Sequence, residues 1–160
     1  MFTRIYWIET IHTGSIGIMP RPRGNEDLES EILYLAKQDV KMLVCLLMPS
    51  EIRELGLQKE KELCEKHQIS FLHFPIPDRS LPDSLQQVYQ LIDQVEQTCL
   101  EGKKVVFHCR GGIGRVTLMA GAILRKTGLT SEDIVKKISQ IRGLQVPDTV
   151  EQAEWLRRFK

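Results

Sequence analysis

The fold and the chemistry of this chain depend on one stretch, His108-Cys109-Arg110-Gly111-Gly112-Ile113-Gly114-Arg115. The segment before it, 104–107, predicts a buried strand, and the apolar run from Val116 onward predicts a buried helix. A glycine-rich loop between a strand and a helix N-terminus forms an anion site, because unpaired backbone N–H groups converge there. The same N–H groups favour the thiolate form of a cysteine placed among them. The stretch therefore predicts a nucleophile that attacks a phosphate-like group.

Composition limits the partners of the chain. The 160 residues suit one domain with one core, and 42% apolar with 27% charged residues is typical of a soluble globular protein. With 22 basic and 21 acidic residues, the net charge of +1 gives no field for nucleic acid or an anionic membrane. No apolar run approaches the roughly 20 residues of a membrane span, and the N-terminus lacks the pattern of a signal peptide. We expect neither a nucleic-acid nor a membrane partner.

The four cysteines, Cys45, Cys64, Cys99 and Cys109, form no CxxC pair. They fall in predicted strands and helices, which favours reduced thiols in the cytoplasm over a disulfide framework. Cys45 lies near the end of a strand expected next to the central one, so it either bonds to Cys109 under oxidation or is a small buried apolar residue. No cysteine, histidine and acidic cluster has metal-ligand spacing, so we expect no metal and no cofactor.

The pattern along the chain predicts an α/β fold. Strands are predicted at 4–8, 42–47, 69–74 and 105–107, and helices at 26–37, 51–55, 58–67, 84–100, 116–124, 130–141 and 147–159. Residues 14–25 are rich in Gly, Pro and Arg and are predicted as a loop or irregular edge. Alternating strands and helices indicate a single domain, 1–160, with a central, mostly parallel sheet flanked by helices. The cysteine loop then lies at the carboxyl end of the central strand, where such folds bind ligands.

The residues of the loop suit phosphate. Gly111, Gly112 and Gly114 let the backbone approach an anion without Cβ clashes. Arg115 offers a planar, two-pronged donor for phosphoryl oxygens. The alternative is a buried cysteine in a tight turn beside a surface arginine, but a plain core would fill the three glycine positions with side chains.

Three segments resemble one family. His108–Arg115 is similar to the signature loop of the cysteine-dependent protein tyrosine and dual-specificity phosphatases. Phe74–Asp78 resembles the loop that carries the general acid, 31 residues before Cys109 as in the small dual-specificity members. Residues 147–152 resemble the late segment whose glutamine helps to place the hydrolytic water. The order of elements from 42 to 159 is most similar to the compact members related to the cyclin-dependent-kinase-associated phosphatase, while the first forty residues carry less of the likeness.

This resemblance implies roles for individual residues. Cys109 would attack phosphorus, Arg115 and the N–H groups of the loop (Arg110, Gly111, Gly112, Ile113, Gly114) would hold the oxygens, and Asp78 would serve as general acid. Asp78 could instead be a turn residue, and Asp83, which could also cap the helix, is the competing acid. Gln152 would place the water, or is an exposed polar residue of a helix. His108 either stiffens the loop from behind or is a satisfied core histidine.

The residue after the loop departs from the family pattern. Val116 stands where the family usually has Ser or Thr, whose hydroxyl assists the second step, and Thr117 is about 100° away around the helix. The resemblance therefore predicts slow hydrolysis of a cysteinyl-phosphate, and leaves open a module that binds phosphorylated protein without turnover. A sulfurtransferase is disfavoured, since its loop is typically one residue shorter.

The resemblance also bears on the substrate. The chain lacks the Asn-Arg-Tyr-type loop that deepens the pocket of tyrosine-specific members. A shallower pocket for phosphotyrosine, and for phosphoserine or phosphothreonine, is implied. Phosphoinositide is a minor option, because the loop holds no lysine. We expect a monomer that acts on phosphorylated protein.

Overall fold

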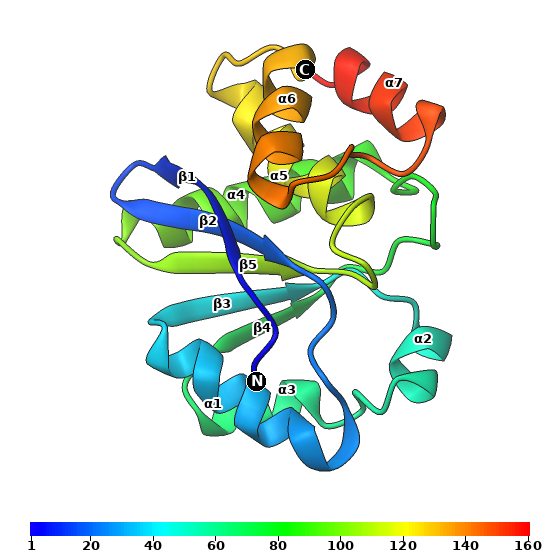
Figure 1. Ribbon diagram of the computed structural model, residues 1–160. Helices are drawn as coiled ribbons and strands as arrows, with labels where there is room; N and C mark the ends of the chain where they lie inside the picture. Colours follow the sequence, from blue (N-terminus) through cyan, green and yellow to red (C-terminus); the bar gives the residue numbers. More distant parts are fainter.

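The computed structural model describes all residues, 1–160, as five strands, seven α-helices and one 3-10 turn (Figure 1). The strands are β1 (Tyr6–Ile11), β2 (Gly14–Met19), β3 (Val40–Cys45), β4 (Ser70–His73) and β5 (Lys104–His108). The helices are α1 (Leu28–Lys37), α2 (Pro49–Glu54), α3 (Glu60–Lys66), α4 (Leu85–Leu100), α5 (Arg115–Lys126), α6 (Ser131–Arg142) and α7 (Val150–Arg158), and the turn is Asn25–Asp27.

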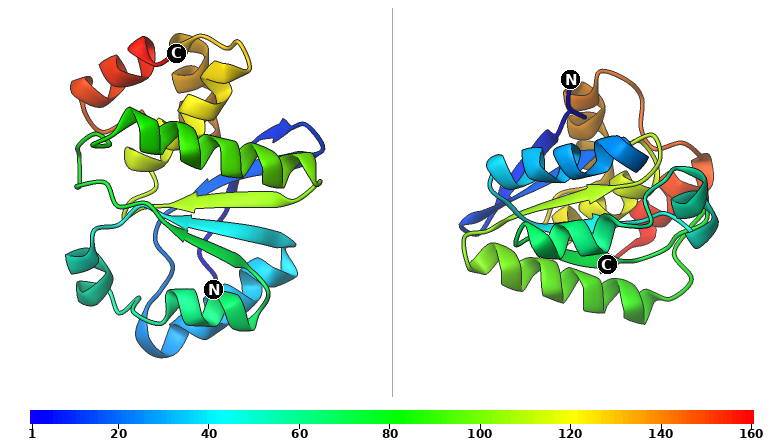
Figure 2. Two further views of the ribbon diagram at one scale, coloured as in Figure 1. Left: turned by 180° about the vertical axis from the view of Figure 1, so that it is seen from behind. Right: turned by 90° about the horizontal axis from the view of Figure 1, so that it is seen from below.

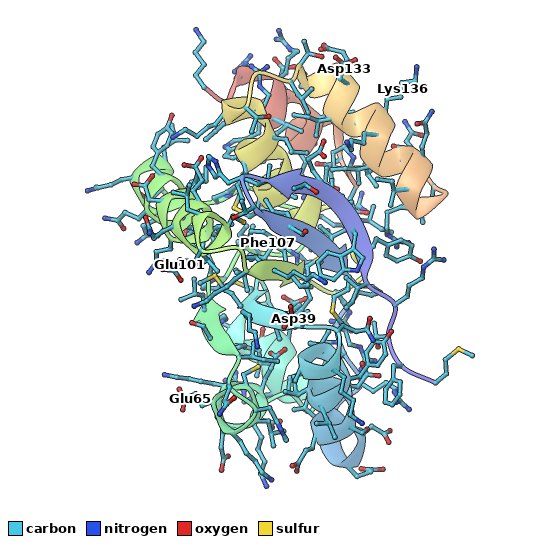
Figure 3. The ribbon with its side chains drawn as sticks, turned by 90° about the vertical axis from the view of Figure 1, so that its left-hand side faces the viewer. Asp39, Glu65, Glu101, Phe107, Asp133 and Lys136 are labelled. Atoms are coloured by element: carbon cyan, nitrogen blue, oxygen red, sulfur yellow. The ribbon has the colours of Figure 1, made fainter.

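The strands form one sheet in the order β1-β2-β5-β3-β4. β1 is antiparallel to β2, and the other neighbours are parallel, so the prediction of a mostly parallel sheet with β5 at its centre is confirmed. Helices cover both faces: α1 and α3 lie on one side, and α4, α5, α6 and α7 on the other (Figure 2). Phe107 of β5 is fully buried between these layers (Figure 3).

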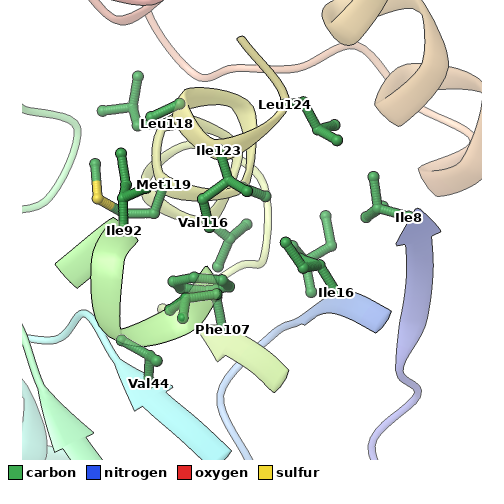
Figure 4. Packing of buried hydrophobic residues seen from close by; sticks show 14 of the residues in the cluster. Ile8, Ile16, Val44, Ile92, Phe107, Val116, Leu118, Met119, Ile123 and Leu124 are labelled. Atoms are coloured by element: carbon green, nitrogen blue, oxygen red, sulfur yellow. The ribbon is translucent and has the colours of Figure 1, made fainter. Parts of the chain in front are cut away.

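Helix α5 lies at the heart of the larger core. Every residue from Arg115 to Leu124 is buried, which confirms the prediction that this helix is enclosed on all sides. Figure 4 shows Val116 of α5 directed toward Phe107 of β5 and Ile16 of β2. Burying these side chains anchors the start of α5, and with it the end of the cysteine loop.

The prediction for residues 14–25 is wrong in its first half, because Gly14–Met19 forms β2, which pairs with both β1 and β5. Its Ile16 and Ile18 are fully buried. Gly17 is a glycine for a packing reason: a Cβ there would lie 2.9 Å from the ring of Trp7 on β1. The glycines that suggest a loop thus serve close packing in the sheet.

Helix starts differ in detail from the predictions. The last helix begins at Val150 and not at 147, because Thr149 caps it and accepts a hydrogen bond from the backbone N–H of Gln152. Val150, the first residue of this helix, is 80% exposed. Ser84, not Asp83, caps α4. None of the helices combines the length and apolarity needed to cross a membrane.

Candidate active site

The site lies where the four parallel strands end. Because β2, β5, β3 and β4 run in one direction, their carboxyl ends meet at a single edge of the sheet. β5 leads into the cysteine loop, β3 into α2, and β4 into the segment that carries Asp78. Topology therefore brings together residues far apart in sequence.

The loop is held from behind by its carbonyl groups. The backbone N–H of Arg21 donates to the carbonyl of Arg110 at 3.1 Å, and the Arg142 side chain donates to those of Gly111 and Gly112 at 3.2 and 3.0 Å. With these carbonyls directed outward, the N–H groups of the loop are free to face an anion. Gly112 has φ +70°, and a Cβ there would lie 2.7 Å from the nitrogen of Pro20, so glycine is required.

Arg115 is almost fully buried, with 2% of its surface exposed. Its two terminal nitrogens donate to the carboxylate of Glu51 at 2.7 and 3.0 Å, and one also donates to the carbonyl of Ile76 at 2.9 Å. Burial alone would raise the pKa of Glu51, but the hydrogen bonds from Arg115 and the N–H of Met48 outweigh it and hold that pKa below its usual range. Glu51 thus fixes the arginine and leaves its Nε edge for a phosphoryl group.

Asp78 reaches the same guanidinium group. Its Oδ1 accepts a hydrogen bond from Arg115 at 3.1 Å, and its side chain is 54% exposed at the mouth of the site. Asp83 instead lines a separate hollow between His73 and α4. The structure therefore brings Asp78, and not its competitor, next to the loop arginine.

Cys109 begins the loop with a free, buried thiol. Cys45 pairs in register with His108, the residue before Cys109, so the side chains of the two cysteines leave opposite faces of the sheet. Accordingly, Cys109 belongs to the core on the α5 side and Cys45 to the core on the α1 and α3 side. The structure does not bring these thiols together for a disulfide.

Val116 and Thr117 offer no hydroxyl to the loop cysteine. The side chain of Val116 is fully buried in the core. The hydroxyl of Thr117 donates back to the carbonyl of Ile113, one turn earlier, at 2.6 Å. The group that the family usually has after the loop arginine is therefore replaced by hydrocarbon.

Gln152 is fully buried beside the loop. Its Oε1 accepts hydrogen bonds from the backbone N–H groups of Asp148 and Thr149 at 3.0 and 3.2 Å, and its Nε2 donates to the carbonyl of Ser80 at 3.0 Å. A Cβ on Gly114 would lie 2.9 Å from Oε1, so the loop and α7 are in close contact. The amide thus joins three segments: the cysteine loop, the start of α7 and the turn after Asp78.

Two further loop residues lie at the edge of the site. The guanidinium of Arg110 is 41% exposed and donates to Glu54 at 3.2 Å, with Glu51 3.7 Å away. Its charge is thus partly balanced at the mouth of the site. Ile113 is half-buried against the core and contributes backbone groups to the loop.

His108 is fully buried behind the loop and contacts Glu60, which is also buried. The distance from His108 Nε2 to Glu60 Oε2 is 2.6 Å, and Cys45 completes a group of three potential metal ligands within 4.8 Å of one another. Ligand atoms around tetrahedral zinc, with bonds of about 2.0–2.1 Å, stand about 3.3 Å or more apart. The short contact therefore fits a charge-assisted hydrogen bond better than a metal site.

Sequence reasoning missed Glu51, Glu60 and Arg142. Glu51 follows Pro49 in a short helix, and a glutamate in the first turn is ordinarily a solvent-exposed residue that favours the helix dipole. Only the path of the chain from β3 and into α3 shows that Glu51 and Glu60 are buried. The Pro-x-Glu start of α2 is a capping signal, and nothing in it indicates contact with an arginine 64 residues away.

A thiol at the head of a loop of N–H groups, with a fixed arginine and a carboxylate beside it, is the arrangement typical of the cysteine-dependent phosphatases. The family model for the DSP-PTPase phosphatases of polymorphic toxin systems matches residues 17–129, and the chain belongs to this family. It thus has the fold and the signature loop of the cysteine-dependent phosphatases of the tyrosine and dual-specificity type, as the sequence predicts.

Individual relatives agree with this assignment. The chain is 28% identical over 102 residues to cyclin-dependent kinase inhibitor 3 of Rattus norvegicus, covering 62% of this chain and 47% of that protein. The human protein of the same name is 29% identical over 91 residues, covering 55% of this chain and 42% of the relative. The chain spans about half, or less, of the length of the curated relatives that it matches.

Solved structures share the whole fold. Kinase associated phosphatase, with its catalytic cysteine replaced by serine, superposes with a TM-score of 0.90 at 18% identity, over 99% of this chain and 94% of that one. Tk-PTP in its active form gives a TM-score of 0.77 at 27% identity, over 97% and 95%. The comparisons favour the phosphatase over a module that binds without turnover.

Proposed function

We propose that residues 1–160 act as one monomeric domain that hydrolyses phosphotyrosine, and phosphoserine or phosphothreonine, in proteins through a cysteinyl-phosphate. The observation that carries this proposal is the convergence of Cys109, Arg115 and Asp78 at one edge of the sheet, with Arg115 fixed by Glu51. The four free thiols suit a reducing compartment, and we propose the cytoplasm.

In the first step the phosphate of the substrate enters the loop. The phosphate dianion accepts hydrogen bonds from the N–H groups of the loop and from the Nε edge of Arg115. It displaces Asp78 from the guanidinium. The thiolate of Cys109 donates an electron pair to phosphorus, forming the S–P bond. The P–O ester bond breaks, and its electron pair stays on the leaving oxygen, which takes a proton from Asp78.

In the second step water attacks phosphorus and the carboxylate of Asp78 accepts one of its protons. The S–P bond breaks, its electron pair returns to the sulfur of Cys109, and inorganic phosphate leaves. The loop N–H groups and Arg115 hold the same oxygens throughout, so one fixed set of donors stabilises both transition states.

The proposed substrate class is tested by a panel of phosphotyrosine, phosphoserine, phosphothreonine and phosphoinositide substrates, with Cys109→Ser as the blank. We expect turnover of phosphotyrosine peptides and weaker turnover of phosphoserine and phosphothreonine peptides. Turnover confined to the phosphoinositide would overturn the substrate assignment while leaving the chemistry intact. Phosphopeptide binding without turnover by the wild type would favour the binding module.

Val116 predicts a slow second step. Because no hydroxyl assists departure of the Cys109 thiolate, rapid mixing with p-nitrophenyl phosphate should give a burst of about one product per enzyme, followed by slower turnover. Val116→Thr, which keeps the shape, should raise steady-state turnover by about tenfold, corresponding to one hydrogen bond of roughly 1.4 kcal/mol. A linear time course with no trapped phosphoenzyme would contradict this prediction.

Replacing Gln152 should affect one of the two steps of the reaction more than the other. Its contacts hold the turn after Asp78, so Gln152→Ala should slow formation of the phosphoenzyme and reduce the burst, most for poor leaving groups. The water-placing role predicts the opposite, a preserved burst and slower release of phosphate. Gln94→Ala, an exposed change on α4, serves as the control. Rapid-mixing kinetics with acid-quenched phosphoenzyme distinguishes the two roles.

A further inference from the structure

A buried pair of ionisable groups lies directly behind the nucleophile. Glu60 begins α3, and His108 ends β5, and 1% and 0% of their surfaces are exposed. Glu60 Oε2 lies 2.6 Å from His108 Nε2, while His108 Nδ1 lies 3.2 Å from the carbonyl oxygen of Cys109. The other carboxylate oxygen, Oε1, is buried without any hydrogen-bond partner. A carboxylate is rarely buried in this way unless its charge is balanced.

The contacts of the ring favour one protonation state. The two oxygens that the ring nitrogens contact, those of the Glu60 carboxylate and the Cys109 carbonyl, are hydrogen-bond acceptors. A neutral imidazole carries one N–H and would face one of these oxygens with a lone pair, whereas an imidazolium donates to both. An imidazolium in this position would connect α3 to the backbone of Cys109 by two donated hydrogen bonds.

We propose that Glu60 is a positioning residue for the phosphatase reaction, which keeps His108 doubly protonated so that its Nδ1–H holds the peptide group between Cys109 and Arg110. That peptide carries the first N–H of the loop. A hydrogen bond to its carbonyl both fixes the peptide plane and polarises its N–H toward the bound phosphate.

The groups around the pair determine its dependence on pH. Glu60 faces His108 from α3, and Cys45 faces it from β3. Cys64 of α3 lies near Glu60 and Cys45. Burial would lower the pKa of His108, but the charge of Glu60 outweighs it and raises that pKa well above its usual range. The stabilisation is therefore complete below about pH 6.5, the unfolded value, and is lost as pH rises through the raised folded value.

The first test uses the wild-type protein and ¹⁵N NMR of its histidine side chains. At pH 7.5 both ring nitrogens of His108 should show the shifts of protonated imidazolium. A neutral ring in the wild type would overturn the proposal. This measurement does not depend on the proposed cysteinyl-phosphate chemistry, so its failure is distinguishable from failure of that chemistry.

The second test replaces Glu60 by Gln, with Glu65→Gln as the matched control, an exposed carboxylate of the same helix (Figure 3). Glu60→Gln should give a neutral His108 and weaken inorganic phosphate binding and kcat/KM by about 10-fold to 100-fold, the usual effect of removing a group that orients a site residue. The folding stability that Glu60→Gln loses relative to the wild type should be larger at pH 6 than at pH 9. Unchanged phosphate binding and kinetics with a neutral ring would reduce Glu60 to a purely structural role.

Discussion

Replacing Cys109 by serine should lower the turnover of p-nitrophenyl phosphate by at least about four orders of magnitude. A serine hydroxyl in this loop has no base to activate it and is not ionised at neutral pH. Its oxygen is therefore a poor nucleophile in place of the sulfur that forms the S–P bond. Steady-state assays with enough enzyme to detect about one part in ten thousand measure the loss.

The same variant should still bind inorganic phosphate. The N–H groups of the loop and Arg115, held by Glu51, remain in place when sulfur becomes oxygen. Cys99→Ser is the matched control, because burial raises the pKa of that thiol to about 11 and it lies on α4, away from the loop. Full activity in Cys109→Ser, or loss of activity in Cys99→Ser alone, would contradict the assignment of the nucleophile.

The sequence predicts the loop well because its signals are local. Cys109, the glycines and Arg115 lie within a few residues of one another, and the strand before and helix after them are apolar runs that need no distant information. Helix α4 is also predicted to within a residue, since it has both a cap at Ser84 and a regular apolar face.

β2 and the carboxylates behind the site are not predictable in this way. The glycines of β2 favour a loop locally, and only the side chains of Trp7 and Ile5, which a Cβ on Gly17 would meet, explain why Gly17 is small. Glu51 and Glu60 have the sequence context of ordinary surface glutamates, and become buried because the turns after β3 direct α2 and α3 against the loop. Such contacts depend on topology and not on local pattern.

Asp78 is the second residue whose loss should have a large effect. Asp78→Asn removes the proton that the leaving oxygen needs, so turnover of alkyl and phenyl phosphates should fall by about two to four orders of magnitude. Its Oδ1 contact with Arg115 places it beside the phosphate site, and an asparagine there keeps the size of the side chain. A series of substituted phenyl phosphates measures the dependence of the rate on the leaving group.

That dependence distinguishes Asp78 from a residue that merely shapes the turn. If Asp78 supplies the proton, Asp78→Asn should be most impaired on the poorest leaving groups and nearly normal on the best, because a stable phenolate departs without protonation. A turn residue would slow all substrates alike. Asp83→Asn is the matched control, since Asp83 lines a different hollow and should leave the rates unchanged. Loss of activity in Asp83→Asn with retention in Asp78→Asn would transfer the proton donor to Asp83.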